Sequence, residues 1–152
     1  MNVADGVARR SLCCRAQVGV ALVSADQRLL SAAYNGPPKG LPVEGSCINW
    51  CPRAQRLDNA PDPVYDDCHA AHAETNAIAR ADYTQMDGST IYVTTSMCKG
   101  CAKIVANSRV ARVVFRYVDD GSDAYRSPSV TEDFLKACGL EVVRWRDSAP
   151  TL

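Results

Sequence analysis

The sequence lacks both the long hydrophobic runs and the excess of charge of one sign that mark several large classes of protein. No run of about 18 consecutive apolar residues occurs, so we expect no membrane-spanning helix. The N-terminal stretch MNVADGVARRSL has no apolar middle region of the secretory type, which favours a cytoplasmic protein. Lys and Arg together number 17, as do Asp and Glu, so the broad basic field typical of proteins that bind long polynucleotides is also missing. A small substrate that carries one phosphate needs few local cations and stays compatible with this balance.

Cysteine, in contrast, is abundant. Thiols stay reduced in the cytoplasm, so this abundance favours metal binding over disulfide bonds. The eight cysteines are Cys13, Cys14, Cys47, Cys51, Cys68, Cys98, Cys101 and Cys138.

The 152 residues suit a single domain (1–152) with one buried core. Apolar runs and turn signals predict strands at 17–24, 29–35, 90–95, 111–118 and 140–145, and helices at 3–14, 72–82, 98–108 and 131–138. Gly139 is expected to end the last helix as its C′ residue. Residues 36–67 form a long loop with six of the eight prolines, and such a loop is usually functional or held by another group. This order predicts an α/β fold in which helices cover a mixed five-stranded sheet.

Two short stretches place metal-binding side chains at predicted helix starts. CKGC (98–101) puts Cys98 and Cys101 on one side of a first helical turn, where the partial positive charge of the helix N-terminus favours thiolates. HAETNAI (72–78) opens another helix with His72. We expect the two helix starts to face each other around a zinc ion bound by His72, Cys98 and Cys101. Its fourth tetrahedral position would be left for water, as in a catalytic site.

Glu74 is expected beside this zinc without binding it. Two thiolates cancel the formal charge of Zn²⁺, so the ion is a weaker Lewis acid than one held by three histidines. A neighbouring carboxylate can take a proton from the water and return it to a ring nitrogen and to a leaving amine. Taken singly, the CxxC motif could be a redox pair and His72 a core histidine. Their combination, with a strand directly before the CxxC motif, favours catalytic zinc.

These motifs resemble those of the zinc-dependent nucleobase deaminases, whose pattern is H-x-E followed by P-C-x-x-C. Within this cytidine deaminase superfamily, residues 9–118 resemble the deoxycytidylate (dCMP) deaminase family. The H-x-E and CxxC motifs define the superfamily only, whereas the loop YNGPPKGLP after the strand VGVALV points to the dCMP branch. Met97 departs from the pattern, which has proline at this position. We expect a looser loop or a reshaped pocket wall there, and no lost ligand.

The resemblance implies a cytidine-deaminase-like three-layer α/β/α fold and the hydrolytic deamination of dCMP to dUMP and ammonia. It assigns Asn35 to a contact with the sugar, and the backbone near Ala73 and Ser96 to the base. A tyrosine near the substrate would be Tyr117 or Tyr125. Many members of the family are hexamers, so a homo-oligomer is expected. Some members are switched on by dCTP and off by dTTP, and Mg²⁺ would accompany such a nucleotide effector.

The remaining cysteines suggest a second metal site. The resemblance extends to a structural zinc bound from the same regions, for which Cys13, Cys47, Cys51 and Cys68 would be the ligands. Four thiolates close a tetrahedral shell, and such a metal would hold the long loop in place. Cys14 or His69 could replace one ligand, and the alternative is buried free cysteines that pack as small hydrophobes. Cys138 is expected in the core, on the apolar side of the last helix.

Several related functions stay open at this point. The substrate could be 5-substituted dCMP, dCTP or cytidine, and related enzymes deaminate guanine, riboflavin precursors or tRNA adenosine. The neutral charge disfavours tRNA, and the loop with Asn35 disfavours the other classes. A non-catalytic nucleotide sensor is a further alternative, although such a protein would not need Glu74. The candidate cations for a phosphate, by location only, are Arg15, Arg28, Lys39 and Arg53.

Overall fold

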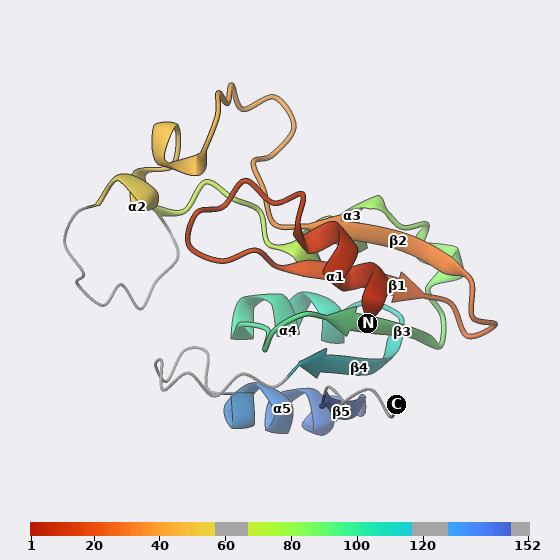
Figure 1. Cartoon of the computed structure of the whole chain (residues 1–152). Helices are drawn as coiled ribbons and strands as arrows, with labels where there is room; N and C mark the ends of the chain where they lie inside the picture. The colour runs from red at the N-terminus through yellow and green to blue at the C-terminus, as the bar shows by residue number, and fades with distance from the viewer. Residues whose placement is uncertain (57–66, 117–127, 147–152) are drawn as a thin grey trace, which may run out of the picture.

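The computed structural model describes residues 1–56, 67–116 and 128–146 (Figure 1). Five strands lie within these residues: β1 (Gly19–Val23), β2 (Leu29–Tyr34), β3 (Ser89–Val93), β4 (Val110–Arg116) and β5 (Glu141–Trp145). The α-helices of the same part are α1 (Asn2–Ala8), α2 (Pro52–Gln55), α3 (Ala73–Arg80), α4 (Lys99–Ala106) and α5 (Pro128–Ala137). Two short 3₁₀ turns, η1 (Cys47–Asn49) and η3 (Tyr83–Gln85), complete the set.

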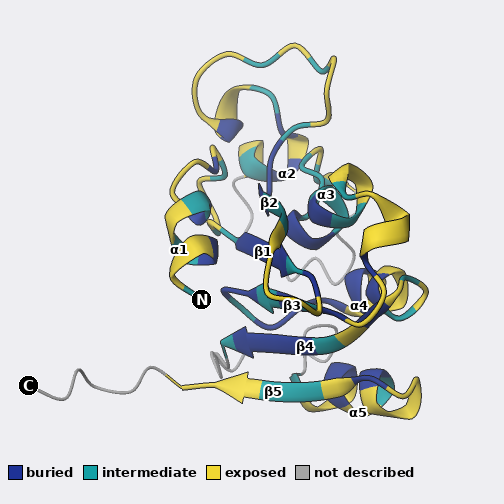
Figure 2. Ribbon diagram, turned by 90° about the vertical axis from the view of Figure 1, so that its right-hand side faces the viewer, coloured by how far each residue is buried: buried dark blue, intermediate teal, exposed yellow. Residues whose placement is uncertain are grey.

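The strands form one mixed sheet in the order β2-β1-β3-β4-β5. β1 pairs antiparallel with β2, to which a tight turn joins it, and also antiparallel with β3 on its other side. β3, β4 and β5 are parallel, because α4 and α5 provide the crossover connections between them. Figure 2 shows α1 on one face of the sheet, and α3, α4 and α5 on the other. The predicted five-stranded sheet and its three-layer arrangement are therefore confirmed.

The core lies mainly between the sheet and α3, α4 and α5. Alternating residues of β3, such as Ile91 and Val93, are fully buried, and so are Ala77 of α3 and Val105 of α4. On the other face, α1 approaches β1 so closely that a Cβ added at Gly19 would collide with the carbonyl oxygen of Ala4. This contact explains why a glycine stands within a buried strand. No helix of the described part is long and apolar enough to cross a membrane.

The first helix is shorter than predicted, and Cys13 does not end it. α1 stops at Ala8, and the Ser11 hydroxyl then donates to the carbonyl oxygen of Asn35 at 2.8 Å and accepts from the backbone N–H of Cys13 at 3.2 Å. A serine that bonds the backbone in this way competes with helical hydrogen bonds. Residues 9–18 therefore leave the helix and run toward the long loop.

The prediction that Cys138 lies in the core is wrong, because this residue is exposed. It follows the last residue of α5, and Gly139 comes next with a φ of 86°. The N–H of Gly139 bonds the carbonyl of Lys136, and that of Leu140 bonds the carbonyl of Leu135. This pair of bonds is a Schellman motif, which confirms Gly139 as the C′ residue. Leu135 and Leu140 fill the core here, and Cys138 turns outward.

The long loop is partly structured. Its described residues, 36–56, include η1 and α2, and they lie beyond the β2 edge of the sheet (Figures 1 and 2). The loop begins beside the start of α3, because Gly36 and Ala71 exchange two backbone hydrogen bonds of 3.1 and 2.9 Å. This bridge brings the segment that contains Asn35 next to His72.

Candidate metal centre

The N-terminal ends of α3 and α4 lie close together, next to the carboxyl end of β3. His72 is the N-cap residue of α3 and Cys98 is the N-cap residue of α4, so neither side chain is committed to a helix face. His72 Nδ1 lies 3.2 Å from Cys101 Sγ and 3.5 Å from Cys98 Sγ. The two helix starts, distant in sequence, therefore bring together the three side chains predicted to bind zinc.

This triangle fits a zinc ion. Candidate ligand atoms of His72, Cys98 and Cys101 all lie within 4.8 Å of one another, and both thiols are buried. Tetrahedral zinc, with Zn–N near 2.0 Å and Zn–S near 2.3 Å, places its ligand atoms about 3.5 to 3.8 Å apart. The observed separations need only a small adjustment to meet this geometry, so the residues present match the metal.

The pKa values of the two thiols are shifted in opposite directions. Hydrogen bonding with Cys101 and His72 lowers the pKa of Cys98 to about 4. The same bond with Cys98, together with burial, raises the pKa of Cys101 well above its usual range. The backbone N–H of Cys101 also donates to Cys98 Sγ at 3.4 Å. Zinc binds cysteine as a thiolate, so a dication held here would displace any proton that the pair carries.

Glu74 lies in the first turn of α3 and is only 3% exposed. Burial raises the pKa of its carboxyl group, although the neighbouring His72 acts in the opposite direction. The carboxyl group also interacts with the side chain of Cys101. A carboxyl group with a raised pKa, next to a metal triangle, has the chemistry of a proton carrier.

Met97 occupies the position of the pattern's proline without opening the site. It is 2% exposed and belongs to the main hydrophobic cluster. The turn into α4 is instead held by the N-cap bond of Cys98 to the N–H of Cys101. Met97 therefore acts as a core residue directly before the first thiol.

The residues predicted to contact the substrate differ in their burial and in their hydrogen bonds. The Asn35 side chain joins two segments, because its Oδ1 accepts from the N–H of Val18 at 2.8 Å and its Nδ2 donates to the carbonyl of Ala16 at 2.9 Å. Its contact with a sugar stays a prediction. Ala73 is fully buried, and Ser96 is 8% exposed with an Oγ that has no hydrogen-bond partner within the described residues. Tyr117 and Tyr125 lie outside the described residues.

Two neighbours of the centre were missed by the sequence analysis. Thr75 Oγ1 lies 3.9 Å from Cys101 Sγ, and Asn76 Nδ2 donates to the carbonyl of Tyr34 at 3.0 Å. The first contact lies beside a ligand, and the second fastens α3 to the end of β2. Their spacing of three and four residues after His72 was the available signal, since such residues share a helix face.

Among the phosphate candidates, Arg28 is far from the centre. It follows β1, near the residues that pair with the start of β3, whereas α4 follows the end of β3. Arg28 also pairs with Asp26 at 2.8 Å. Arg15 and Lys39 are exposed, and Arg53 is 8% exposed.

Four of the five cysteines in residues 13–68 lie in two close pairs, and the fifth, Cys13, is half-buried and interacts with Cys47 and Cys68. Cys14 Sγ and Cys47 Sγ are 2.9 Å apart, and Cys51 Sγ and Cys68 Sγ are 3.9 Å apart. Burial raises the pKa of Cys47 and of Cys68. Burial acts in the same direction on Cys51, but backbone N–H groups, led by that of His69, outweigh it and lower the pKa. His69 is exposed, and its Nδ1 lies 3.1 Å from the carbonyl oxygen of Trp50.

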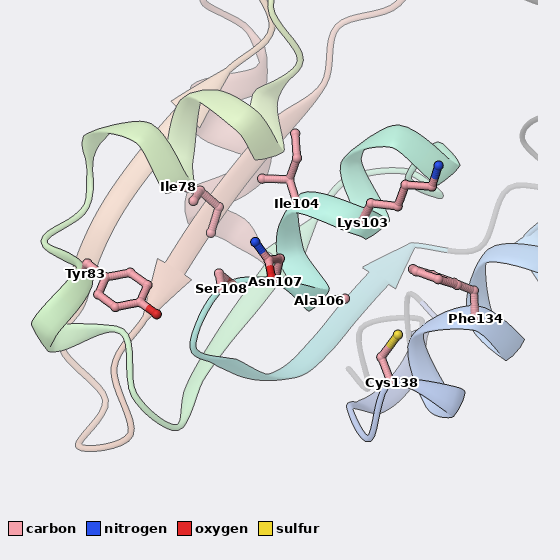
Figure 3. Close-up of a pocket in the computed structure, with 9 residues that line it drawn as sticks. All are labelled: Ile78, Tyr83, Lys103, Ile104, Ala106, Asn107, Ser108, Phe134 and Cys138. Carbon is pink, nitrogen blue, oxygen red and sulfur yellow. The ribbon is translucent and has the colours of Figure 1, made fainter.

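A separate open hollow of about 680 Å³ lies over the opposite ends of the helices (Figure 3). Ile78 of α3, Ile104 and Asn107 at the end of α4, and Phe134 of α5 line it, with Cys138 at the end of α5. None of the predicted zinc ligands borders it, so this hollow is not where we place the chemistry.

Comparison with known proteins gives consistent matches. Residues 1–117 match the family described as the cytidine and deoxycytidylate deaminase zinc-binding region. The chain is 38% identical over 121 residues to a deoxycytidylate deaminase of Mycobacterium phage D29. This match covers 76% of this chain and 89% of that protein. It is 31% identical over 115 residues to the deoxycytidylate deaminase of Homo sapiens, over 76% of this chain and 61% of the human protein. The fold is similar to the crystal structure of a dCMP deaminase from cyanophage S-TIM5 in complex with dCMP and dUMP. That match has a TM-score of 0.69 and 26% identity, and it covers 95% of this chain and 92% of the other.

Proposed function

The chain belongs to the cytidine and deoxycytidylate deaminase family, and we propose that it hydrolyses dCMP to dUMP and ammonia. The reaction would take place at the centre of His72, Cys98, Cys101 and Glu74. One observation carries the proposal: a buried carboxyl group lies next to a His-Cys-Cys triangle whose spacing suits zinc. The chain is accordingly a zinc-dependent hydrolase with the cytidine deaminase fold.

Zinc, when bound by His72, Cys98 and Cys101, supplies a Lewis acid that acidifies water. Glu74 would then move the proton. Its carboxylate would accept a proton from water as the hydroxyl adds to C4 of the cytosine ring, and would pass that proton to the ring nitrogen. It would then take the proton of the new C4 hydroxyl and give it to the amino group, which leaves as ammonia as the C4 carbonyl forms. Because burial raises its pKa, Glu74 holds a proton more readily than an exposed glutamate does. Its low exposure of 3% also limits exchange of this proton with bulk water.

A panel of substrates tests the proposal. Metal-loaded protein is incubated separately with dCMP, 5-substituted dCMP, dCTP, deoxycytidine and cytidine, and the loss of cytosine absorbance is followed. We expect turnover with dCMP. Turnover with dCTP alone would mean that the site accepts the nucleoside triphosphate and not the monophosphate. No change with any of these compounds would favour the second candidate, a zinc protein that senses nucleotides without converting them.

We also propose that Cys13, Cys47, Cys51 and Cys68 bind a second, structural zinc. Cys47 and Cys51 are the buried hydrophobic residues of the described loop 36–56, so this segment has almost no core of its own. A metal would supply what packing does not. The contact between Cys51 and Cys68 would join the middle of the loop to the segment that follows it. The bond of His69 Nδ1 to the Trp50 carbonyl leaves Nε2 as the nitrogen that could replace one cysteine ligand. Metal analysis should find two zinc ions per chain, and a single zinc would overturn this assignment.

The assembly and its regulation are further parts of the proposal. From the family resemblance we infer a homo-oligomer, with a hexamer as the expected form, in the cytoplasm. Light scattering of purified protein measures the mass, and a monomer at all concentrations would contradict it. A nucleotide effector with Mg²⁺ would appear as a change in the dCMP saturation curve when dCTP or dTTP is added. We expect no polynucleotide partner, given the equal numbers of acidic and basic residues.

A further inference from the structure

Cys14 is a surplus thiol at the edge of the proposed structural zinc site. With Cys13, Cys47, Cys51 and Cys68 as the proposed ligands, four thiolates close the tetrahedral shell, and Cys14, the exposed one of the five cysteines, is left over. Cys14 is nevertheless in contact with one of these four, at 2.9 Å from Cys47 Sγ. Cys14 is therefore not needed for metal binding, but it contacts Cys47, which is a proposed ligand. We ask what else this contact can do.

Backbone contacts hold the two thiols together. The N–H of Cys47 donates to the carbonyl of Leu12 at 3.2 Å, and the N–H of Cys14 donates to Cys47 Sγ at 3.0 Å. The contact therefore joins segments 33 to 35 residues apart through three interactions, one of which is between backbone atoms only.

The two thiols differ in access to solvent. Cys14 is exposed, whereas Cys47 is 2% exposed. An oxidant from solution therefore reaches Cys14 first, and Cys47 is buried next to it. This is the arrangement of a reacting cysteine next to a resolving cysteine.

We propose that Cys14 and Cys47 form a thiol-oxidation site for hydroperoxides, which converts the pair to a disulfide. The Cys14 thiolate attacks one oxygen of ROOH, the O–O bond breaks, and ROH leaves with a proton, so that Cys14 becomes a sulfenic acid. The Cys47 sulfur then attacks the Cys14 sulfur and expels hydroxide, which takes the proton of the Cys47 thiol and becomes water. Two thiols and ROOH thus give one disulfide, ROH and water.

Oxidation removes a ligand from the metal shell. This consequence rests on the proposed second zinc, because Cys47 cannot remain a thiolate ligand after it has formed a disulfide. The remaining three thiolates would bind zinc more weakly, and the loop 36–56 would lose its fastening. The disulfide itself does not depend on that zinc, since both thiols are in contact without it.

Peptide mapping tests the pair directly. The metal-loaded full chain is treated with hydrogen peroxide at about one equivalent, free thiols are alkylated, and the digest is analysed by mass spectrometry. We expect a linked peptide that joins Cys14 to Cys47 and disappears after dithiothreitol treatment. Full alkylation of Cys14 after the treatment, or links that join only other cysteines, would overturn the proposal.

Zinc release gives a second readout that is independent of turnover. A chromogenic chelator records release during oxidation of the wild type, of Cys14→Ser and of Cys138→Ser. Cys14→Ser should release zinc several-fold more slowly, while Cys138→Ser, which removes another exposed thiol, should behave as the wild type does. Equal rates in all three proteins would contradict the role of Cys14. Metal content before oxidation tests the second zinc separately, and deamination of dCMP before oxidation tests the catalytic assignment.

Discussion

Glu74 shows how a residue that is unfavourable for the fold can be explained by chemistry. A carboxyl group at 3% exposure reduces stability when it is ionised, and the hydrophobic core would be better served by an apolar side chain. The same burial separates the proton of Glu74 from bulk water and raises its pKa. The burial of Glu74 therefore both lowers the stability of the fold and suits the residue to the proposed proton transfer.

Glu74→Gln should keep its zinc and lose its turnover. Glutamine is close in size and leaves the three proposed ligands unchanged, but it cannot exchange a proton. General acid–base groups contribute about 10²- to 10⁴-fold, so we expect kcat for dCMP to fall within that range or further. Steady-state kinetics and zinc analysis on the same preparation measure the two effects. Glu132→Gln is the matched control, since Glu132 is also buried but bonds Lys136 and Arg144 of the α5–β5 region. Full activity in Glu74→Gln would remove the proton-carrier role.

The contacts of Glu132 predict a pH-dependent stability that is separate from the active site. Burial acts to raise its pKa, but hydrogen bonds from Lys136 and Arg144, each at 2.7 Å in its ion pair, outweigh burial and lower it. A lowered pKa in the folded state means that the stabilisation is present above the unfolded-state pKa and is lost as the pH falls through the folded-state pKa.

Urea unfolding of wild type and Glu132→Gln at several pH values measures this effect. The wild type should be more stable by about 1 kcal/mol near neutral pH, and the difference should shrink toward zero on acidification. Since the two proteins are compared at the same pH, effects of acid on other groups cancel. A difference that does not change with pH would show that the charge of Glu132 contributes nothing.

At the scale of elements, the packing of α1 on β1 depends on Gly19. A methyl group at this position would collide with the backbone of Ala4 and lie 2.8 Å from the N of Ala8. Gly19→Ala should therefore displace α1 and lower the free energy of unfolding by about 1 to 3 kcal/mol. Gly6→Ala in α1 itself meets nothing within 4 Å and should be neutral or stabilising by up to about 1 kcal/mol, because alanine favours helix. Chemical denaturation measures the free energy of unfolding of both variants. A loss in Gly19→Ala but not in Gly6→Ala would come from the contact of α1 with β1 and not from alanine in general.

The elements themselves could be predicted because their signals are local. Apolar runs marked all five strands, and Gly139 marked the end of α5. The end of α1 could not be predicted, since it depends on the bond of Ser11 to Asn35, 24 residues away. The outward position of Cys138 was not predicted, although Gly139 marked the helix end, because the apolar pattern was extended one residue beyond Ala137, where α5 stops. Likewise, the spacing of His72, Cys98 and Cys101 predicted their cluster, whereas the contact of Cys14 with Cys47 arises only when two loops meet.

At the scale of the whole molecule, the two proposed metals have unequal structural tasks. The proposed catalytic centre lies where α3 and α4 already pack against each other and against a largely apolar sheet core. The cysteines of the long loop lie beyond the β2 edge, in a segment whose buried hydrophobic residues are Cys47 and Cys51. Loss of the first metal should therefore affect the chemistry, and loss of the second should affect the fold.

Single ligand substitutions separate these tasks. Cys98→Ser should lose one zinc and turnover while its thermal midpoint changes little. Cys51→Ser should also lose one zinc, but its midpoint should fall by several degrees, because binding energy of a structural metal is folding energy. Calorimetry, zinc analysis and dCMP turnover on each variant give the three readouts, with Cys138→Ser as the control for removal of a thiol outside both sites. If Cys51→Ser kept two zinc ions and the wild-type midpoint, the loop would be held by packing alone. If Cys98→Ser unfolded as readily as Cys51→Ser, the core between α3, α4 and the sheet would be insufficient without its metal, and the division between a chemical and a structural zinc would be wrong.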